Sequence, residues 1–269
     1  MSERSPDGKP TILNHENRIK MTRKAGIIHK LRLAIALVYM MMVLIFLSVT
    51  MTLLMLLSLG RLQNFLIKWG GFLFGRTIPP IAGVRIRFRY HNEKPAGPAI
   101  FVVNHSSTLD LFVITAMMLP RVRYIAKREL GYNPFFWIIT KVTGQIMIDR
   151  KDSRKVYSQL NKAYDYIRRN RLSLLFAPEG TRMVDGKIGP FKPGAFHAAI
   201  DLGYPIVPIF IDGAWDLCPG KSLTIRPGTV TVHFHKEIDT SGWEKSKVHE
   251  YREALRNKYL QWNGEEPAS

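Results

Sequence analysis

A histidine and an aspartate five residues apart could work together as a proton-transfer pair. His105 follows the short apolar run "FVV", and Asp110 lies five positions later in "NHSSTLD". A carboxylate bonded to one imidazole nitrogen fixes the tautomer and stabilises the imidazolium, so the other nitrogen is free to take a proton from a hydroxyl group. No serine or cysteine nucleophile is needed if that hydroxyl belongs to a substrate. On spacing alone, a loop histidine near a helix-capping aspartate is the more frequent arrangement.

A second group of residues could bind a phosphate. The loop "APEGTR" follows the apolar run 172–176 and ends in Arg182. An arginine binds a phosphate through two parallel hydrogen bonds, and a glycine lets the backbone approach it closely. Lys187 and Lys192 add positive charge nearby, and Arg150 leaves another predicted strand. Each basic residue alone fits a solvated charge, whereas Arg150 and Arg182 together favour a phosphate site.

Short apolar runs alternate with helical patterns and must position these loops. The runs typical of strands are residues 84–90, 99–103, 123–127, 145–149, 172–176, 206–211 and 229–235. Helical patterns or helix-start signals mark residues 108–118, a segment that begins at Pro134, and residues 153–169, 194–202 and 244–261. This alternation predicts an α/β fold with a mostly parallel sheet flanked by helices. Functional groups gather at the carboxyl ends of such strands, where the loops carrying His105, Arg150 and Arg182 begin.

The composition predicts an anionic partner. Lysine and arginine total 39 against 21 aspartates and glutamates, which gives a formal net charge of +18 in 269 residues. Nucleic acid, an anionic membrane surface or a phosphorylated substrate would each suit this charge. The sequence has no zinc-finger spacing, no helix-turn-helix signature and no basic region interleaved with aromatic residues, so we expect no nucleic-acid partner. The one cysteine, Cys218, excludes an intrachain disulfide, and we expect it to be a bystander thiol.

Residues 33–60 carry no formal charge and exceed the roughly 20 residues that a bilayer-spanning helix needs. The lysines and arginines of residues 1–32 keep that end in the cytoplasm under the positive-inside rule. A single straight span would place the rest of the chain on the far side. Alternatively, the segment bends near residues 48–50 and returns, with residues 62–74 along the interface. Hydropathy slightly favours the straight span, the chemistry expected below favours the hairpin or a monotopic insertion, and a buried core hairpin is the third alternative.

The sequence contains no convincing set of metal ligands. His233 and His235 alternate along a predicted strand, a pattern more typical of surface residues than of a metal pair. His197 is expected to pack on its helix.

Four sequence blocks in order carry a resemblance to a known family. They are "NHSSTLD", "GQIMIDR", "FAPEGTR" and "YPIVPIFIDG", and "YIAKREL" and "FKPGAFHAA" add to them. Over residues 80–235 the chain resembles the glycerolipid acyltransferases of the lysophosphatidic acid (1-acylglycerol-3-phosphate) type. One departure is Ala177 before Pro178, where the family often has a bulkier residue, and we expect little effect on catalysis.

The resemblance implies roles for particular residues. His105 and Asp110 match the catalytic dyad of the family, and Pro208 matches a residue that shapes the acyl or donor site. The residues expected to bind substrate are Lys127, Arg150, Glu179, Gly180, Thr181, Arg182 and Pro208. The family also has an N-terminal helical pair in the membrane. The chain would then divide into a basic cytoplasmic N-terminus (1–32), a membrane-anchoring hairpin or span (33–78) and an acyltransferase domain (79–263).

The expected reaction moves an acyl group from acyl-CoA or acyl-carrier protein to the free hydroxyl of 1-acylglycerol 3-phosphate, without a metal or a cofactor. We expect it on the cytoplasmic side of the inner membrane, in contact with anionic lipids. Another acceptor, such as a lyso-ornithine lipid, another lysophospholipid or glycerol 3-phosphate, stays open. A rival of a different class is a non-catalytic membrane-anchored protein that binds lipid or nucleic acid. Acyl-chain length, donor type, oxyanion donors and oligomeric state cannot be derived from the sequence.

Overall fold

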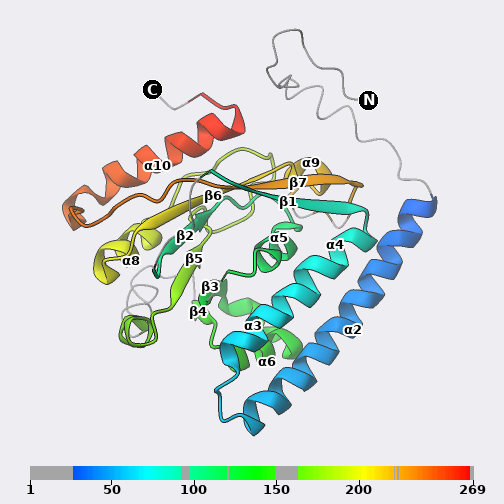
Figure 1. Cartoon of the computed structure of the whole chain (residues 1–269). Helices are drawn as coiled ribbons and strands as arrows, with labels where there is room; N and C mark the ends of the chain where they lie inside the picture. Colours follow the sequence, from blue (N-terminus) through cyan, green and yellow to red (C-terminus); the bar gives the residue numbers. More distant parts are fainter. Residues whose placement is uncertain are drawn as a thin grey trace.

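The centre of the fold is a seven-stranded sheet with the order β1-β7-β6-β2-β5-β3-β4 (Figure 1). The computed structural model describes residues 27–91, 97–119, 121–148, 163–220, 222 and 224–266. The strands are β1 (Val84–Tyr90), β2 (Ile100–Val103), β3 (Val122–Lys127), β4 (Ile146–Ile148), β5 (Ser173–Phe176), β6 (Ile206–Asp212) and β7 (Gly228–Phe234). All neighbouring strands run parallel except β6 and β7. The predicted α/β fold with a mostly parallel sheet is therefore confirmed.

Helices cover both faces of this sheet. They are α2 (Ile27–Leu57), α3 (Gln63–Phe72), α4 (Ile78–Ile81), α5 (Asp110–Ala116), α6 (Pro134–Thr143), α8 (Gly194–Leu202), α9 (Ala214–Leu217) and α10 (Val248–Asn263). A π-helical turn (Leu73–Thr77) joins α3 to α4, and 3₁₀ turns occupy Arg128–Tyr132 and Lys245–Lys247. Within the predicted helix 153–169, residues 163–169 are helical and the rest lies outside the described residues.

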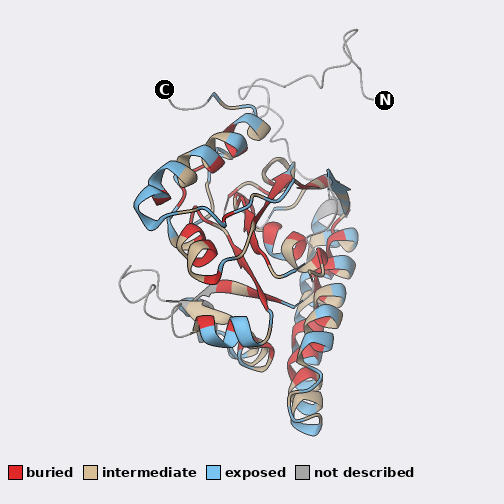
Figure 2. Cartoon of the chain, turned by 60° about the vertical axis from the view of Figure 1, so that its left-hand side comes forward, coloured by how far each residue is buried: buried red, intermediate tan, exposed pale blue. Residues whose placement is uncertain are grey.

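The central strands are buried on both faces, which explains their continuous apolar sequences. In β2, Phe101 and Val103 belong to the core on the side of α2 and α5, whereas Ile100 and Val102 belong to the core on the side of α8 and α10. Figure 2 shows the buried residues concentrated along the sheet and the exposed ones on the outer sides of the helices. Polar residues of these strands are thus confined to the strand ends.

The chain leaves β2 and β5 toward opposite faces of the sheet. After β2 it enters α5, whose Phe112 and Val113 pack in the first core, and after β5 it enters α8, whose Ala195 and Phe196 pack in the second. The two strands are neighbours in the sheet. In open α/β sheets, ligands bind outside the carboxyl ends of strands at such a switch point. The fold therefore places the "NHSSTLD" and "APEGTR" loops at the position where a binding site is expected.

The predicted bend near residues 48–50 is wrong, because α2 continues through them to Leu57. The polar side chains there stay inside the helix: the hydroxyl of Ser48 donates to the carbonyl of Leu44, and that of Thr52 donates to the carbonyl of Ser48. Such bonds one turn back satisfy the hydroxyl groups without ending the helix. The chain reverses after α2, at residues 58–62, and α3 then runs back beside it (Figure 1). One face of α2 packs against α4 and α6.

The returning helix makes a backbone-to-backbone contact with α5. A Cβ atom at Gly71 would lie 2.8 Å from the carbonyl oxygen of Thr115, and a Cβ atom at Gly75 would overlap the backbone nitrogen of Ala116. The guanidinium group of Arg76 also donates through Nε to the carbonyl oxygen of Ala116 at 2.9 Å. The carboxyl end of α5 is therefore held directly by the segment that follows α2.

A buried arginine joins the same segment to the sheet. Arg123 of β3 is 1% exposed, and its guanidinium group donates to Oε1 of Gln63 at 2.7 Å and to Oδ1 of Asn64 at 3.4 Å. Burial lowers the pKa of this guanidinium group, and the nearby Tyr166 opposes the shift. The cation is thus held mainly by neutral oxygen atoms at the start of α3.

Replacing Arg123 by alanine should destabilise the protein, because it leaves a cavity and removes the partner of two amide side chains. We expect the free energy of unfolding to fall by about 2–4 kcal/mol, the range for loss of a buried charged hydrogen-bond network. Chemical denaturation in detergent micelles measures this change. Arg169→Ala, at an exposed position of the helix that precedes β5, is the matched control and should change stability little. Equal effects of the two substitutions would contradict the structural role of Arg123.

Candidate active site

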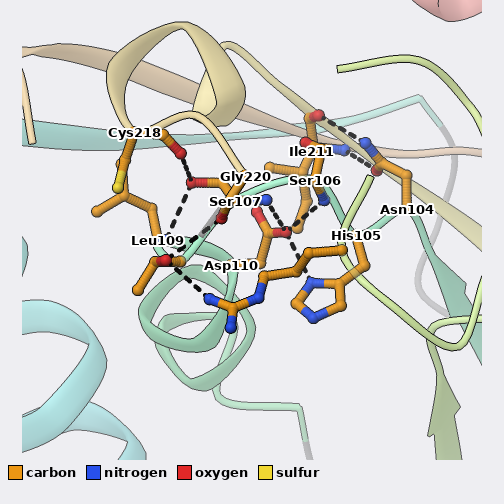
Figure 3. Close-up of polar contacts among 11 residues, drawn as sticks. Asn104, His105, Ser106, Ser107, Leu109, Asp110, Ile211, Cys218 and Gly220 are labelled. Carbon is orange, nitrogen blue, oxygen red and sulfur yellow. Dashed lines mark hydrogen bonds and ion pairs between the residues drawn. The ribbon is translucent and has the colours of Figure 1, made fainter. Parts of the chain in front are cut away.

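His105 and Asp110 form a bonded pair at the carboxyl end of β2. Nδ1 of His105 lies 2.8 Å from Oδ2 of Asp110 (Figure 3). The side chain of Asp110 is 1% exposed, whereas that of His105 is 25% exposed. Figure 3 shows the second ring nitrogen of His105 turned away from the aspartate. The imidazole is therefore held on one side and accessible on the other, which is the geometry that a general base requires.

The same carboxylate oxygen also fixes the loop that precedes α5. The backbone amides of Ser106 and Ser107 each donate to Oδ2 of Asp110 at 2.8 Å. Asp110 is the first residue of α5, so it binds the loop amides as a capping residue would and binds His105 as well. Asp110 thus acts both as a capping residue of the loop and as the partner of His105, the two roles considered for this spacing.

Side chains tie the His105 loop, residues 104–109, to its surroundings. Asn104 continues the pairing of β2 with β6, because its amide donates to the carbonyl of Ile211 at 3.0 Å and accepts from the amide of Ile211 at 2.7 Å. The hydroxyl of Ser107 donates to the carbonyl of Cys218 at 2.7 Å and accepts from the amide of Leu109. Both serve to hold the backbone around His105.

Cys218, Gly220 and Ser222 form a second support that sequence reasoning missed. The amide of Gly220 donates to the carbonyl of Ser106 at 3.1 Å, and the hydroxyl of Thr108 donates to the carbonyl of Ser222 at 3.0 Å. Cys218 is buried, and this burial raises the pKa of its thiol. Its carbonyl accepts a hydrogen bond from Ser107, and its thiol also contacts Ser107 and Thr108 of the His105 loop. Backbone carbonyl contacts of this kind leave no signal in the residue types.

The structure brings the "APEGTR" loop to the His105 loop. Nη1 of Arg182 donates to the hydroxyl of Thr108 at 2.8 Å, and the amide of Met183 donates to the carbonyl of His105 at 3.0 Å. Gly180 has φ 73°, and a Cβ atom there would lie 2.8 Å from Nζ of Lys192. This position therefore favours glycine for its backbone angle and for the lysine that crosses it.

Glu179 is buried behind the pair. It is 4% exposed, and neither of its carboxyl oxygens has a hydrogen-bond partner among the residues that the structure describes. Burial raises the pKa of Glu179 well above its ordinary value, the charge of Asp110 adds to the shift, and the backbone of His105 opposes it. Burial in a low-dielectric interior and the nearby carboxylate both favour the neutral form of Glu179.

The remaining candidates occupy different positions. Thr181 is exposed on the loop, and Lys127 is the last residue of β3. Pro208 lies within β6 rather than at the sheet edge; it is paired with Val102, and its carbonyl accepts from the amide of His235. Arg150 lies outside the described residues.

His233 and His235 are half-buried, not the surface residues that their alternation suggested. The ring of His235 stacks on that of Trp262 in α10 with centroids 3.5 Å apart, and His91 stacks beside it. Burial lowers the pKa of His235 to about 4, and His91 and His233 add to the shift. Within the described part of the chain, no group of three or more histidine, cysteine, aspartate or glutamate side chains is arranged to hold a metal ion.

Comparisons with known proteins define the class of this site. The sequence pattern of the family described as Acyltransferase matches residues 85–212, a range that holds β2, β5, β6 and both loops. The crystal structure of the 1-acyl-sn-glycerophosphate acyltransferase PlsC from Thermotoga maritima has the same fold, with a TM-score of 0.68 and 22% identity over 90% of this chain and all of that one. The chain has the fold of an acyltransferase, and the range that matches the Acyltransferase family holds His105, Asp110 and the "APEGTR" loop.

Relatives found by sequence similarity identify which family of acyltransferases the chain belongs to. The 1-acyl-sn-glycerol-3-phosphate acyltransferase of Haemophilus influenzae is 31% identical over 194 residues, which cover 69% of this chain and 75% of that protein. The enzyme of the same name from Salmonella typhimurium is 32% identical over 185 residues, which cover 67% of this chain and 73% of that protein. The chain belongs to the 1-acyl-sn-glycerol-3-phosphate acyltransferase family, and the resemblance found in its four sequence blocks is confirmed.

Replacing Glu179 by glutamine should show that this buried carboxyl group lowers the free energy of unfolding in a pH-dependent way. A carboxyl whose pKa is raised in the folded state binds more protons there, so the free energy of unfolding falls as the pH rises above the ordinary value of 4.5. Glutamine is neutral and nearly isosteric. The Glu179→Gln variant should therefore gain stability relative to wild type as the pH increases, by at most about 1.4 kcal/mol per pH unit.

Denaturation in detergent from about pH 4 to about pH 8 measures this difference. The exposed Glu244 provides the control, and Glu244→Gln should show a nearly constant difference over the same range. A constant difference for Glu179→Gln as well would mean that Glu179 is ionised in the folded protein.

Proposed function

We propose that this enzyme transfers an acyl group from acyl-CoA or acyl-carrier protein to the free hydroxyl group of 1-acylglycerol 3-phosphate, giving phosphatidic acid. The observation that carries the proposal is the 2.8 Å bond between Nδ1 of His105 and Oδ2 of Asp110, with the other ring nitrogen turned outward. The names of the sequence relatives supply the acceptor. The proposed reaction needs only the acyl donor, the acceptor and side chains of this chain, without a cofactor or a metal ion.

In the proposed mechanism, Nε2 of His105 takes the proton of the acceptor hydroxyl. The hydroxyl oxygen forms a bond to the thioester carbonyl carbon, and the tetrahedral intermediate then breaks its carbon–sulfur bond. The departing sulfur takes the proton back from the imidazolium, so His105 returns to its neutral form. Asp110 keeps Nδ1 protonated and offsets the charge that develops on the ring. General-base catalysis of this kind contributes about 10²–10⁴-fold to the rate.

Phosphate recognition is assigned to the residues around the "APEGTR" loop. The hydroxyl of Thr108 accepts one hydrogen bond from Arg182, and this contact holds the guanidinium group beside the His105 loop. An arginine in a fixed orientation suits a phosphate, because its fork of donors matches two phosphate oxygens. Gly180, Thr181, Lys127 and Arg150 are proposed to line the same site, with Pro208 and Glu179 shaping it from within the sheet and core.

An alternative acceptor, such as a lyso-ornithine lipid, another lysophospholipid or glycerol 3-phosphate, would use the same chemistry. The names of the relatives favour 1-acylglycerol 3-phosphate over these. A non-catalytic lipid- or nucleic-acid-binding protein is disfavoured, because the chain belongs to a family of enzymes and keeps a histidine bonded to a buried carboxylate at a strand end.

We also propose that α2 and the helices that follow it, residues 33–78, anchor the acyltransferase domain, residues 79–263, to the cytoplasmic face of the inner membrane. Lys30–Leu57 is the one helix of the described residues that is long and apolar enough to cross a membrane. Its core side packs against the domain through Leu44 and Leu47. The opposite side is a stripe of exposed apolar residues at intervals of three or four. The stripe consists of Ile28, Leu31, Ile35, Val38, Met42, Ile45, Val49, Leu53 and Leu56.

This stripe favours insertion from one side over a straight span. A helix with one face bound to the catalytic domain cannot be surrounded by lipid, whereas its free face can lie in the acyl-chain region. The basic residues of 1–32 suit anionic lipid headgroups on the cytoplasmic side.

Replacing His105 by alanine tests the proposed function. Acyl transfer from labelled acyl-CoA and acyl-carrier protein is measured with 1-acylglycerol 3-phosphate, glycerol 3-phosphate and a neutral lysolipid as acceptors. Wild type should acylate 1-acylglycerol 3-phosphate, and His105→Ala should reduce kcat by about 10²–10⁴-fold because the base is lost. His249→Ala, at an exposed position of α10, should keep full activity. Acylation of none of the acceptors by wild type, or full activity of a folded His105→Ala variant, would refute the proposal.

Replacing Arg182 by alanine tests phosphate recognition. Loss of one charge-assisted contact, worth about 1.5–3 kcal/mol, should lower kcat/KM for 1-acylglycerol 3-phosphate by about 10- to 100-fold. The same substitution should affect a neutral lysolipid acceptor far less, since that acceptor has no phosphate monoester to lose. Lys187→Ala removes an exposed charge from the same loop and is the matched control. Equal losses with charged and neutral acceptors would show that Arg182 acts on the loop rather than on the phosphate.

A further inference from the structure

A tyrosine from the C-terminal helix reaches between the two strands that lead to the His105 loop. Tyr259 of α10 is fully buried. Its hydroxyl accepts from the amide of Ile209 in β6 at 3.0 Å and donates to the carbonyl of Val102 in β2 at 2.8 Å. The carbonyl of Ile209 lies 3.2 Å from the same oxygen. One hydroxyl group therefore binds both strands, close to their carboxyl ends.

The next contact along these strands is the one made by Asn104. The side chain of Asn104 binds both backbone groups of Ile211, two residues beyond Ile209 (Figure 3). Successive positions of β6 that face β2 are thus bound by side chains, first Tyr259 and then Asn104. His105 follows Asn104 directly, so the position of the imidazole depends on how the ends of β2 and β6 are held.

The ring of Tyr259 is itself fixed by its neighbours. It packs edge-on against Phe191 with centroids 5.2 Å apart and against Phe210 with centroids 6.2 Å apart, both at 74°. Burial raises the pKa of the phenol well above its ordinary value, so the hydroxyl keeps the proton that it donates to Val102. A buried ring packed against several aromatic neighbours leaves the hydroxyl little freedom to move.

We propose that Tyr259 is a positioning residue for His105: its hydroxyl sets the separation and register of the carboxyl ends of β2 and β6, so that Asn104 reaches Ile211 and the imidazole meets Asp110. This inference rests on the proposed role of His105 as the base. Tyr259 lies outside the matched range 85–212 and is fully buried, so its role is to position other groups and not to touch a substrate. Its hydroxyl acts on the His105 loop through the backbone of β2 and β6.

The test is Tyr259→Phe, which removes one oxygen atom and keeps the ring and its packing. Misplacement of a catalytic group by about 1 Å can cost up to about 10²-fold in rate, so we expect kcat to fall by about 10-fold or more. The KM values for both substrates should change by less than about 2-fold, because the hydroxyl of Tyr259 binds β2 and β6 and makes no hydrogen bond to the "APEGTR" loop among the described residues. Tyr251→Phe is the matched control: it makes the same change on the same helix, where the hydroxyl contacts only the amide of Glu244 among the hydrogen bonds of the described residues.

Hydrogen exchange separates positioning from general destabilisation. In Tyr259→Phe, amide exchange should accelerate in peptides that cover residues 100–105 and 206–211 and stay unchanged elsewhere in the sheet. Acceleration across the whole domain, or an unchanged kcat with only a lower melting temperature, would overturn the proposal. His105→Ala is assayed in parallel. If His105→Ala is inactive and Tyr259→Phe is as fast as wild type, only the positioning role fails; if His105→Ala is fully active, the proposed base itself is wrong.

Discussion

Three hydrogen bonds meet at one oxygen atom, Oδ2 of Asp110, and the rest of the site is arranged around it. The atom binds the imidazole of His105 and the amides of Ser106 and Ser107, all at 2.8 Å. These contacts couple the shape of the loop to the orientation of the ring, so neither can change without the other. Burial raises the pKa of the neighbouring Glu179, which favours a neutral carboxyl group beside this oxygen.

The sheet makes such an arrangement possible by separating apolar and polar residues. Strands that are buried on both faces leave no place for a charged side chain except at their ends. The connections from β2 and β5 diverge to opposite faces, so two strand ends lie side by side with no helix crossing between them. The His105 loop and the "APEGTR" loop meet there through direct bonds, such as that from Arg182 to Thr108.

Much of this arrangement could be predicted from the sequence, because it is encoded in local patterns. Apolar runs marked every strand within one or two residues, and the spacing of His105 and Asp110 indicated a pair. The reversal of the chain after α2 was misplaced at residues 48–50, because Ser48 satisfies its hydroxyl group inside the helix. The turn lies at residues 58–62, where Gly60 has φ 82° and ends the uncharged run just before Arg61.

Contacts between distant segments were equally hidden. Tyr259 is, by sequence, one more aromatic residue on an amphipathic helix, yet its hydroxyl binds Val102 and Ile209, which lie 157 and 50 residues away in the chain. The carbonyl of Cys218 supports Ser107 through an atom that every residue possesses. Such roles belong to three-dimensional position, and residue type does not reveal them.

Because Gly71 and Gly75 contact its carboxyl end closely, α5 rigidly connects the proposed membrane anchor to the active site. Seven residues of helix span about 10 Å. Asp110 is the first residue of α5, and the backbone of Thr115 and Ala116 at its other end packs against Gly71 and Gly75. A methyl group at Gly75 would clash with the backbone of Ala116 and push α5 along its axis. The carboxylate of Asp110 at the other end of α5 would then be displaced, although the methyl group touches no residue of the site. The absence of side chains at Gly71 and Gly75 thus helps to fix the distance between the proposed anchor and the active site.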